Sequence, residues 1–142
     1  MNPIPQTAIL APVFALAAWT MLILLLVAGR RVAAALQGRA TAQDFALGEA
    51  PRTPPPVTLA NRNYMNLLEL PLLFYVACLI ALATAKVSPL LLDLGWAYVG
   101  LRIVHSLIHV SYNRVSHRFA AFAASNAVLT AFWVVLGLRV FG

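Results

Sequence analysis

The sequence predicts an all-α integral membrane protein built as one bundle of four transmembrane helices. Of its 142 residues, 62% are hydrophobic and only 10% are charged, and the mean hydropathy is +0.85. Ten Lys and Arg with four Asp and Glu are too few to cover a soluble core of this size, whereas a bilayer requires no polar shell. The chain also holds four apolar blocks long enough for the ~20 residues with which a helix crosses hydrocarbon. Composition therefore excludes a water-soluble enzyme.

The first two blocks predict the first two transmembrane helices. Residues 9–28 contain no charge, and no basic residue precedes them, so a retained span is favoured over a signal peptide. Residues 64–85 carry a single charged side chain, Glu69. Because Pro71 follows closely, we expect a bend in the second helix just after Glu69.

The last two blocks predict the third and fourth helices. Residues 90–110 carry Asp93 and Arg102 and are still long enough to span, and residues 119–138 carry no charge. No repeat divides the chain, so residues 1–142 are expected to form one domain. The expected helices cover, in order, about residues 7–29, 60–85, 89–112 and 118–140.

The connections between helices predict the orientation. The first connection, residues 29–61, contains four arginines, and the third, residues 112–117, contains Arg114. The opposite side carries Lys86 and Arg139. Because cytoplasmic loops are enriched in Lys and Arg, we expect the first and third connections in the cytoplasm and both termini outside.

The first connection is the long polar stretch of the chain and is expected to lie over the membrane face. Its two acidic residues, Asp44 and Glu49, are predicted to lie in a solvated loop. Four prolines predict that its second half is an extended spacer that cannot be helical, namely Pro51, Pro54, Pro55 and Pro56.

Two polar stripes interrupt the apolar helices. On the second helix, the spacing i, i+4, i+7 places on one face Arg62, Asn66 and Glu69. On the third helix, the spacing i, i+3, i+7 does the same for Arg102, His105 and His109. A charge near the bilayer centre costs between ~3 and ~10 kcal/mol or more. Glu69 and Arg102 are therefore expected to face the bundle interior and to pair with each other or with a bound ion.

Two interpretations of these stripes are open. The charged groups could neutralise one another as buried contacts between helices. Alternatively they form a binding site, because Glu69 is the single acid in either stripe and leaves an excess of cations. A small ligand with carboxylates and an amino group fits: arginines would bind the carboxylates, Glu69 the ammonium and Asn66 the amides.

Two other ligand classes are not expected. No metal site is predicted, because the single cysteine, Cys78, and the histidines show no metal-ligand spacing. No nucleic-acid binding is predicted either, because the arginines are spread along apolar segments and form no basic stripe.

The second helix contains an arginine, three residues, an asparagine, two residues, a glutamate and a nearby proline, from Arg62 to Pro71. This run resembles the signature of the MAPEG superfamily, the membrane-associated proteins of eicosanoid and glutathione metabolism, in a bacterial-type member. The third-helix pattern, continued after the loop by Arg118, is similar to that of the microsomal prostaglandin E synthase branch. The resemblance implies a homotrimer of four-helix subunits that binds glutathione in clefts between neighbours, open toward the cytoplasm.

The resemblance also implies roles for individual residues. It assigns glutathione binding to Arg62, Asn66, Glu69, Arg102, His105 and His109. It assigns stabilisation of the glutathione thiolate to Arg118 and matches Arg30 to a basic residue at the end of the first helix, so both are candidate catalytic residues. A neighbouring guanidinium would lower the pKa of a thiol from its usual ~8.5.

Three positions depart from the family pattern. His109 stands where family enzymes commonly have tyrosine, Phe119 where the prostaglandin synthase branch has serine, and Phe122 replaces a further tyrosine. Because histidine can still donate a hydrogen bond, glutathione binding is expected to survive where a specific isomerase chemistry would not.

Three functions are compatible with these observations. The favoured one is a glutathione-dependent membrane transferase or peroxidase that acts on a lipophilic electrophile, a hydrophobic small molecule entering from the bilayer. The second is a small proton-coupled exporter in which Glu69 alternates between a proton and a cationic substrate, although a nearby arginine would hold this carboxylate ionised. The third is a non-catalytic lipid-binding subunit with the same fold.

Overall fold

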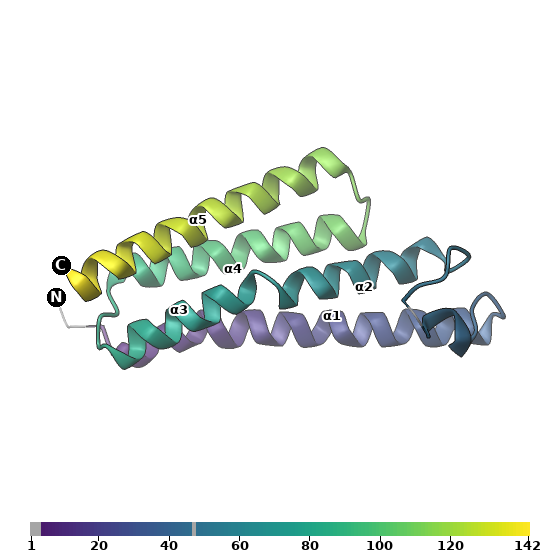
Figure 1. Cartoon of the computed structure of the whole chain (residues 1–142), viewed down its shortest axis with the longest axis horizontal. Helices are drawn as coiled ribbons and strands as arrows, with labels where there is room; N and C mark the ends of the chain where they lie inside the picture. The colour runs from purple at the N-terminus through teal and green to yellow at the C-terminus, as the bar shows by residue number, and fades with distance from the viewer. Residues whose placement is uncertain (1–3, 47) are drawn as a thin grey trace.

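Figure 1 shows the chain as a computed structural model, which describes residues 4–46 and 48–142. Every regular element among these residues is helical. In chain order the elements are η1 (Gln6–Ile9), α1 (Leu10–Leu36), η2 (Ala42–Phe45), α2 (Pro55–Leu68), α3 (Pro71–Ala83), α4 (Pro89–Val110) and α5 (Val115–Phe141). The two η elements are short 3₁₀ helices.

Four helical segments of the described chain are long and apolar enough to cross a membrane. They are Gln6–Leu36, Pro55–Ala83, Pro89–Val110 and Val115–Phe141. The all-helical fold with four spans expected from composition is consistent with this result, and the four segments indicate an integral membrane protein.

The helices pack as two pairs. α4 and α5 form a hairpin, α1 packs along α2, and α4 contacts both members of the second pair. In Figure 1 α5 diverges from the other helices toward the end of the molecule that holds the α4–α5 turn, while α4 stays beside α2. At the other end α3 approaches α5, so the bundle is closed there and open at the α2 end.

Aromatic side chains fill the closed end of the bundle. The ring of Phe74 in α3 lies 4.8 Å from that of Tyr98 in α4 and 6.0 Å from that of Phe132 in α5, measured between centroids. All three are fully buried. Such aromatic pairs each contribute about 0.5–1.5 kcal/mol beyond the burial of area. This packing holds three spans together.

α1 is longer than its apolar block. We predicted an end near residue 29, but the helix continues for about two turns to Leu36. Gly38, with φ +67°, stops it, and the amide of Arg39 donates to the carbonyl of Ala34 at 2.9 Å. Hydropathy predicts the part of a helix that lies in hydrocarbon. The end of the helix is instead set by the backbone, here by the left-handed Gly38.

The prolines before α2 correct a second expectation. α2 begins at Pro55, so the proposed extended spacer ends there and both Pro55 and Pro56 are helical. Proline is compatible with the first helical turn because the amide hydrogens of that turn have no partner within the helix. The run of prolines thus starts this helix.

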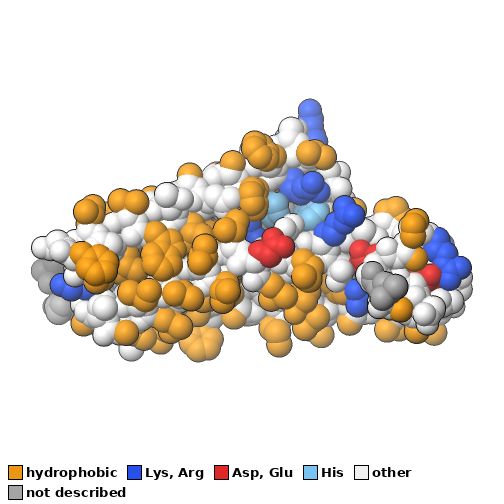
Figure 2. All heavy atoms as spheres, viewed as in Figure 1, with side chains coloured by type: hydrophobic (Ala, Val, Ile, Leu, Met, Phe, Trp, Pro, Cys, Tyr) orange, Lys and Arg blue, Asp and Glu red, His pale blue; other side chains and the backbone are white. Residues whose placement is uncertain are grey.

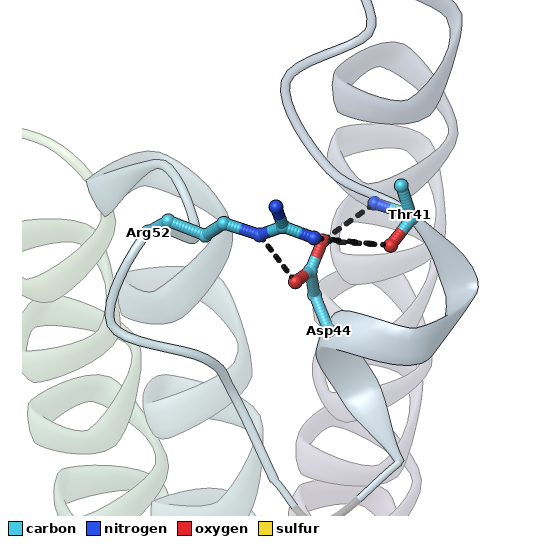
Figure 3. A network of polar contacts seen from close by, with 3 residues as sticks. All are labelled: Thr41, Asp44 and Arg52. Atoms are coloured by element: carbon cyan, nitrogen blue, oxygen red, sulfur yellow. Dashed lines mark hydrogen bonds and ion pairs between the residues drawn. The ribbon is translucent and has the colours of Figure 1, made fainter.

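The first connection is folded by a polar network, drawn in Figure 3. The carboxylate of Asp44 accepts hydrogen bonds from the Thr41 amide at 2.7 Å, the Thr41 hydroxyl at 3.0 Å and Arg52 Nε at 2.6 Å. The hydrogen bond from Arg52, followed by that from the Thr41 backbone, lowers the pKa of Asp44 to about 2. The expected solvated loop is therefore wrong for Asp44, whose side chain is buried.

The second span is broken into α2 and α3. α2 ends at Leu68, Glu69 adopts φ −80° and ψ −94°, and α3 starts at Pro71. Pro71 has no amide hydrogen for the carbonyl of Leu67, and its ring crowds that carbonyl. The bend expected near Pro71 is thus a complete interruption, and Glu69 stands at its edge.

Candidate functional site

A cleft of about 610 Å³ opens between α2 and α5, with α4 as its floor. This volume lies within the ~300–1,000 Å³ typical of small-molecule sites. We call it the α2–α5 cleft. Figure 2 shows the hollow on this face, where basic, acidic and histidine side chains gather beside otherwise apolar spans. It is lined by Leu59, Arg62, Met65, Asn66, Glu69, His105, His109, Asn113, Val115, Arg118, Phe119 and Phe122.

Helix packing creates the cleft. In the described part of the chain α2 and α5 each pack against α4 but not extensively against each other. The aromatic contacts at the closed end hold α3, α4 and α5 together, so the separation between α2 and α5 is confined to the open end.

The α2 wall carries the predicted stripe. Arg62, Asn66 and Glu69 all line the cleft, with Arg62 and Glu69 exposed in the single chain and Asn66 half-buried. The opposite face of α2 is buried, and there Asn63 Nδ2 donates to Ser106 Oγ of α4 at 2.6 Å. This buried hydrogen bond fixes the rotation of α2, so its 3.6-residue period turns the stripe toward the cleft.

Two histidines form the floor. His105 and His109 of α4 are each 3% exposed, and their rings lie 5.8 Å apart in an edge-to-face arrangement. Nε2 of His105 and Nδ1 of His109 have no hydrogen-bond partner among the described residues. Buried polar atoms are normally paired, so the floor holds two ring nitrogens whose hydrogen-bonding capacity the described residues leave unused.

The α5 wall combines one cation with two aromatic rings. Arg118 lies one turn into α5, and its Nη1 donates to Oδ1 of Asn113 at 2.7 Å. Its carbonyl oxygen lies 3.2 Å from Nδ1 of His105. Phe119 and Phe122 continue the wall, and the Phe122 ring lies 5.8 Å from that of His105.

Arg102 is placed differently from the predicted stripe. It is fully buried beneath the cleft and does not line it. Its Nη2 donates to the carbonyl oxygen of Asn66, and its guanidinium lies 5.9 Å from the centre of the Phe122 ring. The expected ion pair with Glu69 is not among the salt bridges of the described residues. The helix break explains the difference, because it frees a carbonyl near the end of α2 that a cation satisfies well.

Arg30 also lies outside the cleft lining. Its guanidinium donates to the carbonyl of Pro56 in α2 at 2.8 Å and to that of Val110, the last residue of α4, at 3.2 Å. A cation at the carboxyl end of α4 is favourable because helix carbonyls there lack partners. In this structure Arg30 joins three helices.

The structure therefore brings six of the eight predicted side chains into one cleft. Sequence reasoning missed Asn113 and the apolar contributors Leu59, Met65 and Val115. Asn113 lies three residues beyond Val110, the last residue of α4, with φ +48°, and asparagine shortly after a helix is a usable signal for such a left-handed residue. The apolar residues carry no signal that separates a cleft wall from a lipid-facing surface.

The lining has a net cationic character. Arg62 and Arg118 outnumber the single carboxylate of Glu69. Among the residues the structure describes, no group of three His, Cys, Asp or Glu side chains could hold a metal ion. The cleft is thus suited to an anionic organic ligand that also carries an ammonium group.

Fold and site together define a four-span helical membrane protein with a polar cleft at one end of its bundle. The profile of the MAPEG family matches residues 9–138, so the chain belongs to this family. Comparison with curated proteins and comparison with solved structures each give no match. Family membership, as expected from the second-helix signature, is thereby confirmed.

Proposed function

We propose that the protein binds glutathione in the α2–α5 cleft and uses it as the thiol co-substrate of a transferase or peroxidase. The second substrate would be a lipophilic electrophile that arrives from the bilayer. Membership in a family that includes glutathione transferases and peroxidases supports this class of activity.

The charge pattern of the cleft is the observation that carries the proposal. Glutathione has two carboxylates, one ammonium group, two amides and a thiol. Arg62 can bind a carboxylate, Glu69 can bind the ammonium, and Asn66 can bind an amide. His105 and His109 line the floor; because Nδ1 of His105 faces the carbonyl oxygen of Arg118, Nδ1 carries the proton of the neutral ring and Nε2 can only accept a hydrogen bond. The residues present therefore fit this ligand.

Arg118 is the proposed catalytic residue. A guanidinium beside the thiol favours the thiolate, and the thiolate is the nucleophile. In a transfer reaction its sulfur bonds to the electrophilic carbon while the bond to the leaving group breaks, and the thiol proton goes to water. Phe119 and Phe122, next to Arg118 along α5, offer an apolar wall to a lipophilic electrophile.

We also propose that three copies assemble around such clefts. Glu69 lies midway along the Pro55–Ala83 span and is exposed in the single chain. An ionised carboxylate facing lipid at that depth is costly, so a neighbouring subunit is expected to cover it. The cleft lies at the end of the bundle that holds the arginine-rich connections, which we propose to be cytoplasmic.

Calorimetric titration of the purified protein with glutathione tests binding, and conjugation of a generic aryl halide and reduction of a lipid hydroperoxide test turnover. Glu69→Gln should weaken glutathione binding, whereas Arg139→Ala should not, because Arg139 lies exposed at the far end of α5. No glutathione binding by the wild-type protein would refute the proposal. Binding without turnover of either substrate class would instead support the non-catalytic subunit.

A further inference from the structure

The turn between α4 and α5 holds the guanidinium of Arg118. In the described residues this guanidinium has one hydrogen-bond partner within the chain, Oδ1 of Asn113 at 2.7 Å. Because arginine can only donate, the asparagine must present its oxygen and not its amide nitrogen. Both residues line the α2–α5 cleft, so the contact is made at its wall.

The position of Asn113 is itself fixed by α4. Its amide donates to the carbonyl of Ile108 at 2.9 Å, across the last turn of that helix. Its backbone is left-handed, with φ +48°, a conformation that asparagine tolerates better than most residues. The backbone of Asn113 is thereby held against the end of α4, the helix that carries His105 and His109.

Arg118 is consequently held at two points that both belong to the α4 side. Its carbonyl oxygen contacts Nδ1 of His105 at 3.2 Å, and its Nη1 is bound by Asn113. The remaining N–H groups of the guanidinium have no partner among the described residues and can donate to a ligand. Because the guanidinium is planar, the hydrogen bond from Nη1 restricts the directions in which its remaining N–H groups can point.

We propose that Asn113 is a positioning residue, which aims the free edge of the Arg118 guanidinium at the thiolate of bound glutathione. This inference rests on the proposed function. Positioning Arg118 requires the side-chain oxygen of Asn113. Ending α4 requires only a residue that accepts a left-handed backbone.

Two substitutions separate positioning from helix termination. Asn113→Gly keeps the left-handed backbone and removes the oxygen, whereas Asn113→Asp keeps an acceptor and adds a negative charge beside Arg118. The matched control is Ala85→Gly in the α3–α4 turn, where φ is +53° and the side chain makes no polar contact. This control measures the effect of glycine at a left-handed position on thermal stability.

The readout is the pH dependence of thiolate absorbance for glutathione bound to the full-length protein. Asn113→Gly should raise the pKa of the bound thiol by roughly one unit. At a pH below the wild-type pKa this lowers the thiolate fraction about tenfold. Asn113→Asp should raise it further, because the carboxylate offsets the charge of Arg118. Binding of S-methylglutathione, which has no ionisable thiol, should change by less than about twofold in Asn113→Gly.

Arg118→Ala is the reference variant that distinguishes failure of the positioning inference from failure of the proposed function. If it raises the thiol pKa while Asn113→Gly retains the wild-type value, the Asn113 oxygen does not position Arg118 and the inference is overturned, with the proposed function intact, even if the added charge of Asn113→Asp raises the pKa. If the wild-type protein binds no glutathione, or Arg118→Ala leaves the thiol pKa unchanged, the proposed thiolate site fails and the inference fails with it.

Discussion

Replacement of Arg62 by alanine gives a direct measure of the proposed glutathione site. Arg62 lines the cleft, is exposed in the single chain and has no hydrogen bond or salt bridge to another described residue. Its removal therefore leaves no protein group unpaired, and the loss in affinity reports on the ligand alone. A hydrogen bond to a charged group contributes about 1.5–3 kcal/mol. Because exposure weakens such a contact, we expect about 1.5 kcal/mol, or roughly a tenfold increase in Kd.

Calorimetry in mild detergent at low and high salt can test this magnitude. The difference in Kd between wild type and Arg62→Ala should shrink at high salt, because exposed charges are screened over about 10 Å at 0.1 M. Arg62→Lys should lie between the two, since an ammonium lacks the planar fork of a guanidinium. Arg139→Ala should bind as the wild type does. Equal affinity of Arg62→Ala and wild type at low salt would show that Arg62 does not contact glutathione and would refute the assigned site.

Four further outcomes are expected. Arg118→Ala should retain glutathione affinity while kcat falls, and Arg118→Lys should also lose activity if the planar group matters; full activity in both would make Arg118 a membrane anchor. The Asp44 network should stabilise the first connection above the unfolded pKa of ~3.9 and lose this contribution as pH falls toward the folded pKa of about 2. Asp44→Asn should therefore increase proteolysis of that connection at neutral pH, and an unchanged cleavage rate would contradict the network's role. Arg102→Met should lower the free energy of unfolding by about 1–3 kcal/mol, since the Asn66 carbonyl loses its partner. A stabilised variant would contradict this and would show that the cost of burying the Arg102 charge is larger than the gain from its hydrogen bond. Mass measurement in mild detergent should give three copies, and monomers alone would exclude the proposed trimer.

Much of the fold could be predicted because membrane insertion depends on local composition. An uncharged run such as residues 9–28 specifies a span whatever its neighbours are. The stripe from Arg62 to Glu69 could be predicted for a similar reason, because the helix period alone puts these residues on one face. That they meet His105 and Arg118 in one cleft follows from packing among three helices, which the spacing within each helix does not contain.

The remaining features depend on backbone groups that the sequence does not list. Hydropathy placed the end of α1 near residue 29, while the backbone continues to Leu36 and stops at the left-handed Gly38. The sequence predicts that Arg102 pairs with Glu69 or with a bound ion, because charged groups are the partners that a sequence makes visible. Its observed partner is the backbone carbonyl of Asn66, which the helix break leaves without an intrahelical partner. A sequence does not show which backbone carbonyls lack a partner.

The interruption between α2 and α3 sets an order for the assembly of the bundle. Hydrocarbon offers no water to the carbonyl of Asn66, and its partner Arg102 is contributed by α4, a later span. Until that span arrives, the Pro55–Ala83 segment is expected to remain one proline-kinked helix, because this keeps more of its backbone hydrogen bonds. Docking of α4 would then complete the break and leave Glu69 at its edge. The binding surface is thus expected to form late, and a nascent chain that ends before α4 should insert its first two spans but hold no recognisable part of the cleft.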